Sequence, residues 1–399
     1  MPAITSEVAY LILLFGLMVI PRALQRFRIP APLTSFGFGM VAAVFLSSFS
    51  HDATLSLLAT LGVSSLFLFA GLEIDFEDLK RGRWPLLGHL LVRSMTLCAS
   101  GWLLMNYFDL QWQVAALVAL ALLTPSTGFI LDTLPQLGLS EEERYWVTIK
   151  AVGGEFLALA GLFVVLQSGS PQTLVLSTAA LLAMIVVLPL LFIALARLVV
   201  PYAPGSEFSL LVMVGLIASY LTYQLGVYYL VGAFLAGFIA RLLRKRMPML
   251  ASDQNLRAIQ MFASFFVPFY FFYKGMSVPS GALTVEALGL GLAMTAAALP
   301  LRIGGVWLQR RFIKHESARG SLRVATALSP TLIFTLVLAT IMRERFDIPD
   351  AWYGGLLVYA ALTTLLPSLV LAKPLDFNVQ VGPLPASPLR APQRGDSTA

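Results

Sequence analysis

Glu155 is the residue of this sequence whose type and position most clearly invite chemistry. It lies near the centre of an apolar segment, in Ala151-Val-Gly-Gly-Glu-Phe-Leu-Ala158. If that segment crosses a lipid bilayer, an ionised carboxylate at its centre is costly unless it faces protein or water and has a partner. Such a carboxylate can bind a proton or a cation, so the two compete for one group. The alternative is a permanent ion pair that only locks the helix.

Four basic residues in apolar segments are candidate partners of this carboxylate. Arg302 is the first choice. Lys274 could instead extend its ammonium group to the membrane surface, and Arg93 could close a pair within its own helix bundle. Lys150 comes five positions before Glu155, about 140° around a helix, and therefore does not share its face.

Two prolines interrupt apolar segments and supply further candidate ligands. Pro125 lies in Leu123-Thr-Pro-Ser-Thr-Gly128 and Pro330 lies in Leu328-Ser-Pro-Thr-Leu332. A proline within a membrane span removes one backbone donor and frees a carbonyl one turn earlier, which lipid cannot satisfy. Hydroxyls and freed carbonyls are hard oxygen ligands that can replace the hydration shell of Na⁺ or K⁺. The alternative is a pair of ordinary proline kinks. The candidate ligands beside Glu155 are Thr124, Ser126, Thr127, Ser329 and Thr331.

The composition indicates an integral membrane protein. Of the 399 residues, 58% are hydrophobic and 12% are charged, whereas about 25% charged residues are typical of soluble domains. The net charge of +6 fits basic cytoplasmic loops better than a nucleic-acid-binding surface, so no nucleic-acid partner is expected. One cysteine and three histidines leave little room for a metal cluster or haem. No soluble catalytic motif occurs, so neither a cofactor nor an enzyme activity is expected.

Apolar runs, cut at charge clusters and at Pro and Gly, predict an all-α membrane protein with about 13 transmembrane helices. Lys and Arg gather in alternate loops, which predicts an inner (plasma) membrane protein with the N-terminus outside and the C-terminus in the cytoplasm. The proline-rich residues 373–399 are expected to form a disordered tail. The helices are expected near residues 8–26, 30–48, 54–74, 84–106, 113–134, 146–168, 172–198, 207–225, 228–243, 258–278, 282–309, 321–342 and 350–372.

The chain resembles itself at an offset of about 200 residues. The stretch from Leu66 to Gly71 resembles the one that ends at Gly275, and Pro125 follows Gly71 by 54 residues as Pro330 follows Gly275 by 55. The matching segments lie seven helices apart. Because seven is an odd number of membrane crossings, the second copy is expected to be inverted in the bilayer, as in many transporters. Chance similarity of two proline-containing helices is the alternative. The transmembrane domain, 1–372, would then comprise repeat one at about 8–168, a linker helix at about 172–198 and repeat two at about 207–372.

Several motifs together resemble a known family over nearly all of residues 8–372. They are the stretch from Leu66 that ends Phe-Ala-Gly-Leu-Glu-Ile-Asp75, Val231-Gly-Ala-Phe-Leu-Ala-Gly237, Phe266-Val-Pro-Phe-Tyr-Phe-Phe-Tyr-Lys-Gly-Met276 and the two interrupted helices. The chain is similar to the monovalent cation:proton antiporters, in the branch of the bacterial sodium/proton and potassium/proton exchangers.

This resemblance implies six helices, a linker and six more, with a core domain that moves against a dimerisation domain. The two interrupted helices would cross beside the ion, and the protein would be a homodimer. The ion-binding aspartate of the family falls on Glu155, and the polar residue that commonly precedes it falls on Gly154. The basic residue of the eleventh helix falls on Arg302.

The sequence therefore predicts a secondary transporter that exchanges a monovalent cation, Na⁺ or K⁺, for protons by alternating access. Glu155 would be the shared carboxylate, and Asp132 could line the cytoplasmic funnel. Transport of a small organic anion on the same scaffold is one alternative, in which basic residues such as Arg302 and Lys274 attract the substrate. A membrane sensor or scaffold with Glu155 in a fixed ion pair is another.

Overall fold

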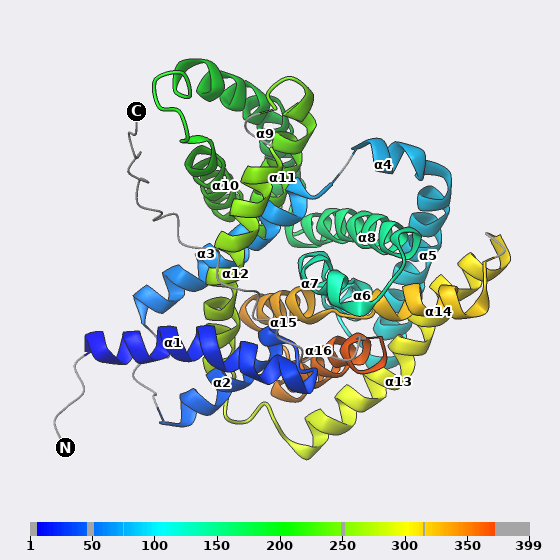
Figure 1. The fold of residues 1–399 in the computed structure, drawn as a ribbon. Coiled ribbons are helices and arrows are strands. Elements are labelled where there is room, and N and C mark those ends of the chain that lie inside the picture. Colours follow the sequence, from blue (N-terminus) through cyan, green and yellow to red (C-terminus); the bar gives the residue numbers. More distant parts are fainter. Residues whose placement is uncertain (1–5, 46–51, 75, 249–251, 314–315, 372–399) are drawn as a thin grey trace, which may run out of the picture.

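The computed structural model describes residues 6–45, 52–74, 76–248, 252–313 and 316–371, and these residues form helices and no β-strand. The predicted tail at 373–399 lies outside the described residues. Figure 1 shows that the helices gather in two groups, with α9, α10 and α11 on one side and α5 to α8, α13 and α14 on the other.

The first group is built around α3 (Ala53–Leu72), which packs against both α11 and α12. Helix α12 also packs against α2, and α10 packs against α11. The other helices of this group are α1 (Ser6–Leu24), α2 (Ala31–Phe45), α9 (Pro171–Leu198), α10 (Glu207–Gln224), α11 (Tyr229–Leu242) and α12 (Asp253–Met276).

The second group holds the two interrupted helices. Helices α6 (Trp112–Leu123) and α7 (Thr127–Thr133) form one of them, and α14 (Ala318–Ala327) and α15 (Leu332–Phe346) form the other. Around them pack α5, α8, α13 and α16. Their bounds are Arg83–Phe108 for α5, Glu141–Gln167 for α8, Val285–Leu308 for α13 and Asp350–Val370 for α16, and a short helix α4 (Phe76–Arg81) precedes α5.

Helix α8, which carries Glu155, begins at a complete capping box. The Ser140 hydroxyl accepts a hydrogen bond from the Glu143 backbone N–H, and the Glu143 carboxylate accepts one from the Ser140 N–H. Two backbone donors at the start of the helix are thereby satisfied. The negative charges of three glutamates in its first turn also interact favourably with the positive end of the helix dipole. Local sequence thus sets where the long helix begins.

Two glycines of the sequence motifs are needed for close packing in the first group. A Cβ added at Gly71 of α3 would lie 2.3 Å from the carbonyl oxygen of Phe234, and one at Gly237 of α11 would lie 2.1 Å from that of Leu68. Because no real side chain fits at such distances, only glycine lets the backbones of α3 and α11 approach so closely.

Helix length and hydropathy support a membrane-spanning fold. Among the described residues, nine helices are long and apolar enough to cross a membrane, and the bent pair α14 and α15 makes up to ten. Three further predicted spans correspond to the helices α2, α5 and α11, which are not among these nine or ten candidates. The number of thirteen spans therefore stays a prediction.

Candidate functional site

The two interrupted helices meet at their breaks through two hydrogen bonds, one between backbone groups and one from a backbone N–H to a side-chain hydroxyl. The Ser126 N–H donates to the carbonyl oxygen of Pro330 at 2.8 Å, and the Phe334 N–H donates to the Ser126 hydroxyl at 3.2 Å. Both breaks occur at the prolines that the sequence indicated, because neither Pro125 nor Pro330 can donate to the preceding turn. The helices therefore cross where their backbones are open.

The last three carbonyls of α6 would normally accept hydrogen bonds from residues 125, 126 and 127 of a continuous helix. Side chains of other helices take them instead. Thr335 donates to the Ala121 carbonyl at 2.8 Å, Tyr359 donates to the Leu122 carbonyl, and Arg93 donates to the Leu123 carbonyl. The hydrogen bonds lost at the break are thus replaced, as a membrane interior requires.

Arg302 of α13 serves the same purpose at the end of α14. Its guanidinium donates to the Leu328 carbonyl at 2.7 Å and to the Ser329 carbonyl at 2.8 Å, and it also reaches the Tyr359 hydroxyl at 3.1 Å. Free carbonyls at a helix C-terminus carry partial negative charge, which attracts a cation. No ion pair joins Arg302 to Glu155 among the described residues, so the expected charge partner binds the broken helix in this structure.

Arg93 and Arg302 bind the C-terminal ends of α6 and α14. Glu155 instead lies near the N-terminal ends of α7 and α15, the second halves of the two broken helices. Its side chain is 1% exposed, and its Oε2 atom is buried without a hydrogen-bond partner. It shares a small cavity, too tight for a water molecule, with residues at the N-terminal ends of α7 and α15 and with three residues of α3. The N-terminus of a helix carries partial positive charge, which favours an ionised carboxylate. The other residues that line the cavity are Ser126, Gly128, Ile333, Phe334, Leu66, Phe67 and Ala70.

The predicted hydroxyl ligands divide into two sets. The Thr124 hydroxyl is buried without a hydrogen-bond partner, the Thr127 hydroxyl interacts only with the Glu155 carboxylate, without standard hydrogen-bond geometry, and Ser126 lines the Glu155 cavity. In contrast, Ser329 donates to the Thr363 carbonyl at 3.0 Å, and the Thr331 and Thr363 hydroxyls are 3.0 Å apart. The first break therefore has free oxygens, whereas the hydroxyls of the second break are engaged with α16.

The two lysines lie away from the carboxylate. Lys150 donates to Oε1 of Gln309, 2.7 Å away, and the same oxygen is 3.1 Å from Nδ1 of His89. Lys274 of α12 lies half-buried near Glu344 of α15. Neither side chain is paired with Glu155 in this structure.

Two cavities approach the site from the end of the molecule that the loop charges assign to the cytoplasm. A cavity of about 300 Å³ is lined by Arg22 and Asp132 and shares Leu66, Gly128 and Ile333 with the Glu155 cavity. Asp132 therefore lines a cavity that adjoins the site, and its place in a cytoplasmic funnel stays a prediction.

A second cavity of about 280 Å³ lies beside the start of α8 and ends at Val152, about one turn before Glu155. Glu73, which follows α3, lines it together with Arg144. Burial raises the pKa of the Glu73 carboxyl, and the charge of Arg241 partly offsets this. A titratable acid therefore lines this second cavity.

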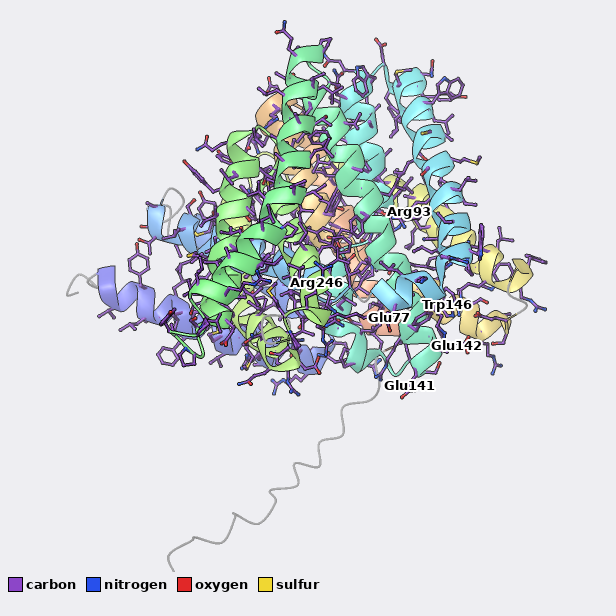
Figure 2. All side chains as sticks on the ribbon, turned by 90° about the horizontal axis from the view of Figure 1, so that it is seen from above. Glu77, Arg93, Glu141, Glu142, Trp146 and Arg246 are labelled. Atoms are coloured by element: carbon purple, nitrogen blue, oxygen red, sulfur yellow. The ribbon has the colours of Figure 1, made fainter. Side chains whose placement is uncertain are left out.

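The sequence reasoning missed the roles of Arg93, Tyr359 and Thr335. Figure 2 shows Arg93 between α5 and α8, well inside the bundle and away from the end where Glu141 and Glu142 lie. One signal was available, since each helix that precedes an interrupted helix carries one arginine in its apolar part, Arg93 and Arg302.

Comparisons with known proteins agree with the fold. A relative, the probable Na⁺/H⁺ antiporter 3 of Methanocaldococcus jannaschii, is 23% identical over 371 residues, which cover 90% of this chain and 94% of the relative. The solved structure of the sodium proton antiporter MjNhaP1 from the same organism at pH 8 has a TM-score of 0.64 and 17% identity, with 91% of this chain and 95% of that chain covered. An electron-microscopy structure of MjNhaP1 gives a TM-score of 0.64 at 16% identity, with 92% and 94% covered.

The strongest of the comparisons is a family match. Residues 10–376 match the family described as the transmembrane sodium/hydrogen exchangers. Because this match extends over most of the chain and the fold is that of a solved antiporter, the protein belongs to the sodium/hydrogen exchanger family.

Proposed function

We propose that this protein is a secondary antiporter that exchanges a monovalent cation, Na⁺ or K⁺, for protons by alternating access. Glu155 is the carboxylate that the two ions share. The observation that supports this role most directly is the unpartnered Oε2 atom of a fully buried Glu155 at the positive ends of α7 and α15. A buried oxygen without a partner is rare in folded proteins, and at a functional site it is available for a ligand.

Exchange follows from competition at this single carboxylate. With either ion bound, its charge is neutralised and the site can move through the membrane interior. The empty, ionised form moves poorly, because an uncompensated charge there is costly. Net movement of one ion is thereby coupled to movement of the other in the opposite direction.

The accessory ligands in this proposal are the hydroxyls and carbonyls at the breaks. Thr124, Ser126 and Thr127 are the first candidates, because Thr127 interacts with Glu155, Ser126 lines the cavity and the Thr124 hydroxyl is buried without a partner. Ser329 and Thr331 would join only if α15 or α16 shifted, since both are hydrogen-bonded to Thr363. Arg302 is proposed to compensate Glu155 when no cation is bound.

The remaining features of the proposal concern the whole protein. We infer that two inverted repeats, at about 8–168 and 207–372, build the transport unit and that the helix at about 172–198 links them. The protein would act as a homodimer in the plasma membrane, with the N-terminus outside and the C-terminus in the cytoplasm. Loop charge and the resemblance to antiporters support these features.

The test is ion exchange by purified protein in proteoliposomes that contain a pH-sensitive dye. Addition of Na⁺, K⁺ or Li⁺ to wild-type protein should release protons, and Glu155→Gln should abolish the response. Asp132→Asn, which changes an acid in the funnel, is the matched control and should retain exchange with a changed KM. A wild-type response that persists unchanged in Glu155→Gln would refute the proposal. An anion-dependent response that needs Arg302 would instead indicate organic anion transport, and no response at all would indicate a sensor or scaffold.

A further inference from the structure

A cavity of about 350 Å³ lies between the end of α9, the start of α10 and the segment that follows α11. This volume is at the lower end of the range for small-molecule sites, about 300–1,000 Å³. Three charged side chains, Arg197, Glu207 and Arg246, line the cavity together with apolar residues such as Ile193 and Val200. The loop charges predict that this end of the molecule lies at the cytoplasmic surface of the membrane.

Glu207 is the most unusual of these side chains, because it is buried and unpartnered. It lies in the first turn of α10, where the helix dipole favours a negative charge, and it is 7% exposed. No hydrogen bond or ion pair joins its carboxylate to any residue that the structure describes. A buried carboxylate without a cation or a donor beside it is costly, so the cavity favours a positively charged group at this position.

The two arginines of the cavity are exposed, unlike Glu207. Within the described part of the chain, neither guanidinium has a hydrogen bond or an ion pair. The arginine two positions before Arg246 differs, since Arg244 pairs with Asp253 at 2.9 Å. Arg197 and Arg246 are therefore free to bind an anion, and a guanidinium binds phosphate oxygens particularly well.

The wall that α9 contributes is apolar and exposed. Helix α9 is the most apolar of the candidate spans, and only 17% of its apolar stretch is buried within the protein. Ile193 lies on this helix and Val200 follows it, and both line the cavity beside Arg197. A lipid could therefore place its polar part among the charged groups while its acyl chains lie along α9. Basic pockets between helices at the cytoplasmic surface are typical sites for lipid headgroups.

We propose that this cavity binds the headgroup of phosphatidylethanolamine, a phospholipid that carries both a phosphate and a primary ammonium group. The ammonium is the tip of this headgroup and meets the buried carboxylate of Glu207. The phosphate, which is nearer the glycerol, lies between Arg197 and Arg246. The order of the charges in the cavity, with the acid buried and the arginines exposed, thus matches the order of the charges in the headgroup.

Two other phospholipids match the cavity less well. Phosphatidylcholine has a trimethylated ammonium group, which cannot donate a hydrogen bond to the Glu207 carboxylate. Phosphatidylglycerol has a phosphate for the arginines but no positive charge for Glu207. The cavity should therefore distinguish these lipids although all three carry a phosphate.

The test measures how each lipid changes the apparent Tm of the purified protein in detergent. The three lipids, with identical acyl chains, are added separately. A ligand that binds only the folded protein raises its Tm, and at about 100 times its Kd the rise for a chain of 399 residues is roughly 3 °C. Wild-type protein should show a rise of this size with phosphatidylethanolamine and smaller rises with the other two. Equal rises with all three lipids, or the largest rise with phosphatidylglycerol, would overturn the proposal.

Two variants separate the two parts of the headgroup. Glu207→Gln removes the charge that meets the ammonium, so the preference for phosphatidylethanolamine over phosphatidylcholine should disappear. The double variant Arg197→Gln, Arg246→Gln should lower the response to all three lipids, because each of them carries a phosphate. A preference that survives Glu207→Gln, or an unchanged response in the double variant, would contradict the assignment.

The matched controls change the same residue types at the same end of the molecule. Glu142→Gln alters an exposed acid in the first turn of α8, and Arg257→Gln alters an exposed arginine of α12; neither residue lines this cavity. Both variants should keep the wild-type preference, and loss of the preference in either would overturn the proposal. Soluble glycerophosphoethanolamine should have no effect at the same concentration, and an equal rise would refute a membrane lipid as the ligand. Because ion exchange is not measured, failure of the proposed function would not affect these outcomes.

Discussion

Replacing Thr335 by valine tests how the broken helices are held together. Pro125 has no N–H, so the Ala121 carbonyl loses its normal helical partner, and the Thr335 hydroxyl donates to it at 2.8 Å from the other broken helix. Thr335 is fully buried. Valine has almost the same shape, so Thr335→Val removes the hydrogen bond and leaves the packing nearly unchanged.

The expected cost follows from the carbonyl that is left unpaired. A buried acceptor without a partner costs about 1–3 kcal/mol. For a chain of 399 residues, this corresponds to a fall in apparent Tm of roughly 1–4 °C. Exchange should also slow, because the crossing of α6 and α15 positions the proposed ligands of the ion. The measurements are thermal unfolding of purified protein and dye-coupled exchange in proteoliposomes.

Thr222→Val is the matched control. Thr222 of α10 is also fully buried, but its hydroxyl donates to the Ala218 and Ser219 carbonyls of its own helix at 3.2 and 3.0 Å. Those carbonyls keep their backbone partners in a continuous helix, so the change in Tm should stay below about 1 °C. Equal effects of Thr335→Val and Thr222→Val would refute the reasoning that the carbonyls at the break depend on side chains from other helices.

Three further changes test other parts of the structure. Tyr359→Phe removes the donor to the Leu122 carbonyl, so we expect a Tm lower by roughly 1–4 °C and slower exchange; unchanged values would contradict this. Ser140→Ala removes the cap that accepts from Glu143 and should cost about 1 kcal/mol in unfolding experiments, with the exchange rate retained. Because burial raises the pKa of Glu73, the folded protein binds its proton more tightly than the unfolded chain, and wild-type stability should fall as pH rises above the ordinary value of 4.5. Glu73→Gln should remove this fall, and an identical pH dependence of the Tm would argue against it.

Much of the fold follows from the sequence alone. In a membrane each backbone polar group must be paired within its own helix, so long apolar runs become helices almost regardless of their neighbours. The breaks at Pro125 and Pro330 follow equally directly, because the missing N–H and the ring forbid a continuous helix. Glu155 can also be identified from its local sequence, because a single carboxylate in an apolar segment is energetically costly in a membrane. Its role in exchange stays a proposal.

The partners of these groups were decided by the tertiary structure. Thr335 and Tyr359 lie 214 and 237 residues away from the carbonyls that they satisfy, and no local pattern links such positions. Arg302 was expected at the carboxylate, but free carbonyls at the end of α14 lie closer to it. The hydrogen bond from Arg93 to the Leu123 carbonyl likewise needs α5 and α6 in place. The sequence by itself determined the helices and their interruptions, because backbone chemistry is local; only the packed structure determined which charge meets which helix end, because that depends on distances between segments far apart in the chain.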